Sequence, residues 1–130
     1  MSSKTDYWLE LCDDDLITAK ALLDSKRLLH TGFFCHAVAE KALKAIIADI
    51  TNEVPPKIHD LGKLAIRGGI DGDLSDEQNT LLDDLGPMQI EARYPDYKAK
   101  IAQTLTYAKV KQMLTETEAF LCWIKQRLGK

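Results

Sequence analysis

The sequence is poor in cysteine, glycine and proline, and it contains no long hydrophobic run. Its three cysteines, Cys12, Cys35 and Cys122, are far apart, and each lies within an apolar helical pattern. Because a disulfide framework requires pairs and a zinc site requires clustered ligands, we expect neither and predict buried structural thiols. No apolar run approaches the roughly 18 residues that a membrane-spanning helix requires. The polar residues 1–6 do not resemble a secretory signal, so we expect a cytoplasmic protein that does not enter a membrane.

Common catalytic motifs are also missing. There is no glycine-rich phosphate loop, no Gly-x-Ser-x-Gly motif, no Cys-x-x-Cys pair and no dinucleotide fingerprint. Gly72 stands between Asp71 and Asp73, which would repel a phosphate rather than bind it. The net charge of −3 argues against a dedicated DNA-binding protein, because such domains are usually basic.

The charge is unevenly distributed along the chain. Residues 1–97 carry a net charge of −8 and residues 98–130 a net charge of +5. Two interpretations are open. Acidic and basic faces can meet, within the fold or across a dimer, or the basic last helix can attract a polyanion.

What the sequence does contain is helical periodicity. The length of 130 residues favours a single domain over residues 1–130. Apolar residues recur every three or four positions in four segments, at about 5–24, 31–51, 59–66 and 107–128. Another helix is expected from Ser75, which forms a capping box with Gln78. We expect residues 28–32 to form a turn and residues 91–97 an ordered loop. With no strand candidate, the pattern predicts an all-α, up-and-down bundle of four to five helices.

The second expected helix carries three ionisable residues in an otherwise apolar segment. His36, Glu40 and Lys44 recur every four residues and therefore lie on one helix face. Because unpaired buried charge is unfavourable, they either pair within the fold or face a wet groove. Pairing of Glu40 with His36 and Lys44 is the structural interpretation, and contact with a nucleotide phosphate or a partner's charges is the functional one. No metal site is expected, because this segment supplies only two ligands and no second His/Glu pair is evident.

Two further segments contain candidate binding residues. His59 and Asp60 stand at the start of the short helix, either as capping residues or beside a phosphate at its N-terminus. Arg93, Tyr94 and Tyr97 lie in the expected loop, where arginine can bind phosphate or carboxylate and tyrosines can stack on bases. The structural interpretation of this loop is an arginine–carboxylate pair with tyrosines packed against the bundle.

Taken together, these residues resemble the HEPN domain family over nearly the whole chain. Four blocks in order carry the resemblance: residues 7–23, beginning Tyr-Trp-Leu, residues 32–45, His59-Asp60-Leu61, and residues 92–96, Ala-Arg-Tyr-Pro-Asp. The resemblance implies a helical bundle of four to five helices, commonly a homodimer. It also implies a prokaryotic protein that works beside a nucleotidyltransferase encoded nearby, in a toxin–antitoxin-like pair, and a possible nucleotide ligand.

Many HEPN proteins are metal-independent ribonucleases with an Arg-x(4–6)-His motif, and this sequence departs from that motif. No histidine follows His59, and Arg27 reaches only His30, with two residues between them. A ribonuclease of that type needs an imidazole for acid–base chemistry near neutral pH. We therefore expect a non-catalytic module without a cofactor. Its candidate ligand- or partner-binding residues are His36, Glu40, Lys44, His59, Arg93, Tyr94 and Tyr97.

Two other functions stay open. One is an RNA-cleaving toxin in which His36 or His59 works with Arg93. The other is a purely structural dimerising scaffold, in which Glu40 and its neighbours make ordinary intersubunit ion pairs.

Overall fold

The computed structural model describes residues 3–90 and 95–130, and these residues form an all-α fold. Its helices are α1 (Ser3–Asp24), α2 (Leu28–Thr51), α3 (Leu61–Arg67), α4 (Asp76–Leu85), α5 (Pro95–Thr104) and α6 (Tyr107–Arg127). Two single turns of 3-10 helix, η1 (Asp71–Asp73) and η2 (Gly86–Met88), flank α4. The predicted all-α bundle is confirmed. The described ranges hold six α-helices, because the segment that follows the undescribed residues 91–94 is helical from Pro95, where we expected the loop to continue to Tyr97.

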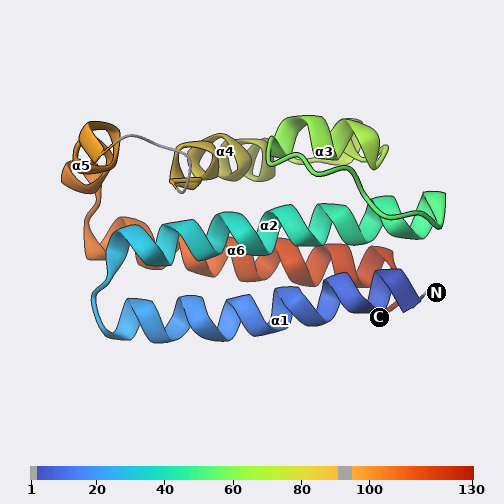
Figure 1. Cartoon of the computed structure of the whole chain (residues 1–130), viewed down its shortest axis with the longest axis horizontal. Coiled ribbons are helices and arrows are strands. Elements are labelled where there is room, and N and C mark those ends of the chain that lie inside the picture. The colour runs from blue at the N-terminus through green and yellow to red at the C-terminus, as the bar shows by residue number, and fades with distance from the viewer. Residues whose placement is uncertain (1–2, 91–94) are drawn as a thin grey trace.

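The chain makes four passes along the long axis of the bundle (Figure 1). Helices α1 and α2 run antiparallel and pack side by side, and α3, η1 and α4 return along α2 as one divided pass. Helix α5 lies at the end of the bundle where α1 ends and α2 begins, and α6 then runs back beside α1 and α2. Helix α2 is therefore central: it contacts α1, α6 and the divided third pass.

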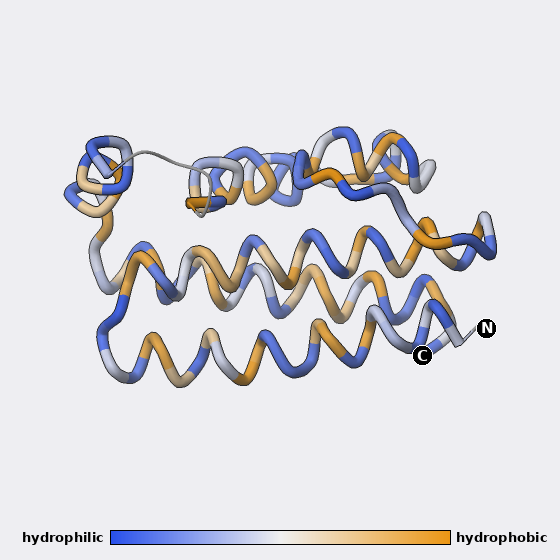
Figure 2. Tube along the Cα trace, in the orientation of Figure 1, coloured by the Kyte–Doolittle hydropathy of each residue, from blue (hydrophilic) through white to orange (hydrophobic). Residues whose placement is uncertain are grey.

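The core follows this arrangement. Figure 2 shows apolar positions recurring at helical spacing along α1, α2 and α6. The small residues Ala39, Ala42 and Ala45 of α2 are completely buried, which allows neighbouring helices to approach α2 closely. On α6 the predicted apolar stripe is confirmed over its central turns, where Val110, Leu114, Thr117, Phe120, Leu121 and Ile124 are all buried. Tyr107, the first predicted position of the stripe, is instead exposed. The predicted capping box of α4 is also present, with Ser75 and Gln78 exchanging hydrogen bonds of 2.9 and 3.1 Å.

The turn between α1 and α2 lies earlier in the chain than expected. Lys26 adopts a left-handed conformation (φ 59°), and the backbone N–H of Arg27 donates to the carbonyl of Leu22. These features end α1 and satisfy its last carbonyl groups. The prediction that residues 28–32 form the turn is wrong, because the chain has already reversed by Arg27 and α2 begins at Leu28.

Ion pairs join the basic C-terminal part of the chain to acidic residues within the fold. They are Lys125–Asp13 (2.6 Å), Arg127–Asp73 (2.5 Å) and Lys130–Asp6 (2.7 Å). At these positions acidic and basic residues therefore meet within the fold, as in the first of the two interpretations of the charge asymmetry. Each of these pairs is exposed, so each contributes at most about 1 kcal/mol.

The three cysteines do not share one environment. Cys12 and Cys35 are buried as predicted, but Cys122 is exposed. The prediction of a buried Cys122 is wrong because α6 turns its Leu121 and Ile124 positions to the core, which leaves Cys122 on the solvent side. Within the described part of the chain, no helix is long and apolar enough to cross a bilayer.

Candidate functional site

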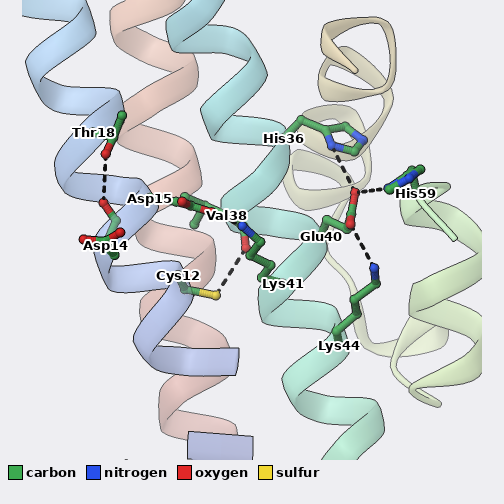
Figure 3. A network of polar contacts seen from close by, with 10 residues as sticks. All are labelled: Cys12, Asp14, Asp15, Thr18, His36, Val38, Glu40, Lys41, Lys44 and His59. Atoms are coloured by element: carbon green, nitrogen blue, oxygen red, sulfur yellow. Dashed lines mark hydrogen bonds and ion pairs between the residues drawn. The ribbon is translucent and has the colours of Figure 1, made fainter. Parts of the chain in front are cut away.

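Glu40 is the centre of a buried polar network on α2 (Figure 3). Its Oε2 accepts a hydrogen bond from Nζ of Lys44 at 2.9 Å. Its Oε1 lies 2.9 Å from Nδ1 of His59 and 3.6 Å from Nδ1 of His36. His36, Glu40 and Lys44 are only 2, 7 and 6% exposed. The predicted pairing of Glu40 with Lys44 is therefore confirmed, whereas His36 lies beside the carboxylate beyond hydrogen-bond distance.

Lys44 has a second partner on a different helix. Its ammonium group lies 5.5 Å from the centroid of the Trp8 ring of α1, within the range of a cation–π interaction. The buried lysine is thus held between a carboxylate and an aromatic ring. Removing either charge of such a pair would leave the other one buried without a counter-charge.

His36 is held in its neutral form. Burial lowers its pKa below the usual 6.5, and the nearby Glu40 carboxylate opposes this shift without overcoming it. At neutral pH the ion pair on this face is therefore between Glu40 and Lys44, with a neutral imidazole beside it.

Of the two roles expected for His59 and Asp60, the structure shows capping, and for Asp60 alone. Asp60 is the N-cap of α3, and its side chain accepts a hydrogen bond from the backbone N–H of Lys63 at 3.0 Å. His59 precedes the cap, and its ring turns to Glu40 while its side chain stays 62% exposed. Sequence reasoning missed this contact, because the two residues are 19 positions apart and no periodicity connects them.

A groove of about 640 Å³ opens beside this network, lined by His36 of α2 and otherwise by residues between His59 and Gln89. His36 and His59 line it together with three exposed carboxylates, Asp60, Asp71 and Asp83. Its apolar lining includes Leu61, Ala65, Ile66, Leu74 and Leu82. The described lining contains no lysine or arginine, so the groove is acidic. Of its carboxylates, sequence reasoning noted that Asp71 repels phosphate but missed Asp83, which only the placement of α4 brings here.

The remaining predicted residues lie elsewhere. Tyr97 is half-buried in the first turn of α5 and does not line the groove. Arg93 and Tyr94 lie outside the described residues. The structure therefore brings together four of the seven predicted residues: His36, Glu40, Lys44 and His59.

Over ranges 3–90 and 95–130, no group of three or more His, Cys, Asp or Glu side chains is arranged to hold a metal ion.

Comparison with known proteins identifies the family. Comparisons with curated proteins and with solved structures gave no match. The family model of the HEPN domain matches residues 5–128. Since this match spans nearly the whole chain and the described fold is all-helical, the chain belongs to the HEPN domain family.

Proposed function

We propose that this chain is a non-catalytic, cytoplasmic HEPN module that binds a protein partner. The resemblance to HEPN proteins indicates the partner class, a nucleotidyltransferase of a prokaryotic toxin–antitoxin-like pair. The proposal rests on one observation: the groove is open, and the polar side chains beside it already contact one another. Glu40 has contacts to Lys44, His36 and His59, so the network supports the wall of the groove and does not need a ligand for its own stability.

The charge of the groove favours a protein partner over a nucleotide. A phosphate in the groove would approach Asp60, Asp71 and Asp83, and like charges at close range repel. No lysine or arginine of the described lining would offset this repulsion.

One observation favours a second candidate, an RNA-cleaving enzyme. A buried carboxylate that orients the Nδ1 side of an exposed imidazole is the arrangement of a general acid–base histidine, and Glu40 and His59 have it. The acidic lining opposes this candidate, because an RNA backbone would be repelled from the same groove.

Calorimetry of the full chain tests the proposal. The titrants are a nucleotidyltransferase from the same organism, taken from the neighbouring gene where that gene encodes one, and, separately, ATP. We expect binding of the enzyme and none of ATP. Absence of binding to the nucleotidyltransferase would contradict the proposal, and RNA cleavage that His59→Ala abolishes would establish the second candidate instead.

We also propose that the module forms a homodimer, as HEPN proteins commonly do. Tyr7 and Val54 support this, since they are 56 and 70% exposed and line a shallow hollow of about 280 Å³ at one end of the bundle. Analytical ultracentrifugation tests it, and a monomer at all concentrations would contradict it. A dimer that binds neither the nucleotidyltransferase nor ATP would leave the structural scaffold as the function.

A further inference from the structure

We propose that the acidic groove binds an arginine-bearing segment of the partner protein. This inference rests on the proposed function and names the chemistry of the partner at that site. The first argument is the size of the groove: about 640 Å³ is far more than a single metal ion fills and is comparable to a site for several side chains.

The second argument is the arrangement of charge around an apolar lining. Asp60 belongs to the N-cap of α3, Asp71 to η1 and Asp83 to α4, so carboxylates reach the groove from three separate elements. Leu61 and Leu82 lie among them. An apolar lining with acidic groups around it complements a side chain that has an aliphatic stem and a cationic head.

The third argument comes from His59. In the Nδ1–H tautomer of His59, Nδ1 donates a hydrogen bond to Glu40, and the lone pair of Nε2 can accept one. The His59 side chain is exposed and lines the groove, so this acceptor is open to a ligand. A guanidinium group carries five N–H donors in a plane, so one head group has enough donors for a carboxylate and an imidazole acceptor together. Arginine is also more weakly hydrated than lysine, which favours it beside apolar side chains.

The test uses the full-length chain and fluorescein-labelled synthetic peptides in anisotropy titrations. The probe is an amphipathic peptide with three arginines, and its counterparts carry lysine, citrulline or glutamate at the same positions. We expect affinity in the order arginine, lysine, citrulline, with no binding of the glutamate peptide. Glutamate or citrulline peptides that bind as tightly as the arginine peptide would overturn the inference.

A matched pair of variants locates the site. The groove variant is Asp60→Asn, Asp71→Asn and Asp83→Asn, in which asparagine at position 60 keeps an N-cap residue. The control is Asp14→Asn, Asp24→Asn and Asp49→Asn, with the same change in net charge at exposed positions outside the groove. We expect the groove variant to bind the arginine peptide at least about tenfold more weakly and the control to bind within about twofold of the parent. Equal loss in both variants would overturn the inference, because it would reduce the effect to net charge.

The two variants also separate this inference from the proposed function. If the nucleotidyltransferase binds the parent and the groove variant equally, the chain is a partner-binding module that uses another surface. The assignment of the groove is then wrong, while the proposed function still stands. If the groove variant loses self-association in ultracentrifugation while the control keeps it, the groove binds a second copy of this chain, and the assignment to a partner protein is overturned.

Discussion

The ring of His59 contacts the carboxylate of Glu40 at 2.9 Å across 19 positions of sequence, and this contact joins the loop before α3 to the middle of α2. Because Glu40 also accepts a hydrogen bond from Lys44, one carboxylate contacts both the exposed His59 ring and the buried Lys44 ammonium group. Glu40 therefore holds the loop before α3 and the buried Lys44 at the same time.

Replacing Glu40 by glutamine should destabilise the fold. The amide keeps the size of the side chain but leaves Lys44, which is 6% exposed, without its counter-charge. We expect a loss of roughly 3 kcal/mol in the free energy of unfolding, measured by urea denaturation. The matched control is Glu118→Gln, which breaks an exposed pair with Lys20 and should change stability by less than about 1 kcal/mol. Equal effects of the two substitutions would contradict the buried network.

The stability of the protein should fall on acidification, in part through His36. Since burial lowers its pKa, the unfolded chain takes up a proton near pH 6.5 that the folded chain does not. His36 therefore favours unfolding as the pH falls through about 6.5 and has little effect above it. Glu40, Lys44 and His59 face this ring and modulate the size of the effect.

The measurement is the free energy of unfolding of the parent and of His36→Gln between roughly pH 5 and 8, the range in which histidine titrates. We expect the variant to lose less stability than the parent over that range. His30→Gln is the control, because His30 is exposed at the start of α2. A parent-like pH profile for His36→Gln would show that another group causes the decline.

Gly32 of α2 should be sensitive to the addition of a single methyl group. A Cβ at this position would lie 2.5 Å from Sδ and 3.2 Å from Cγ of Met88, so the methionine would have to move. We expect Gly32→Ala to destabilise the protein by about 1 kcal/mol, because the overpacking outweighs the better helix propensity of alanine.

The sign should reverse when Met88 is shortened. With Met88→Ala in place, Gly32→Ala should stabilise the protein, since only the gain in helix propensity remains, worth up to about 1 kcal/mol. A double-mutant cycle by urea denaturation measures both effects. The same sign in both backgrounds would rule out the contact as the cause.

Only Cys122 should react rapidly with a thiol reagent in the folded protein. Burial raises the pKa of Cys35 to about 12 and raises that of Cys12 as well, so neither forms a thiolate at neutral pH. We expect one fast thiol before denaturation and three after it, measured with Ellman's reagent. In Cys122→Ser the fast phase should be absent, and its persistence would place another thiol at the surface.

Local signals in the sequence determined most of the helices. The apolar spacing of α6 and the capping box of α4 depend on residues within one or two turns of each other, so they could be recognised without the fold. The start of α2 could not, because it depends on how Lys26 and Arg27 end α1 through backbone hydrogen bonds. The helical segment from Pro95 was missed for another reason, since Pro95 and Tyr97 in its first turn are also typical of a loop.

In the candidate site, the sequence by itself determined the row of His36, Glu40 and Lys44, because a spacing of four residues places side chains on one helix face in any fold. Only the tertiary structure brought His59 to Glu40 and placed the carboxylates of Asp71 and Asp83 around the same groove. These contacts depend on how the third pass lies on α2, and no spacing along the chain carries that information. The roles of Arg93 and Tyr94 stay predictions. The sequence thus determined which helix face is charged, and the packing of α3 and α4 decided that this face borders an acidic groove.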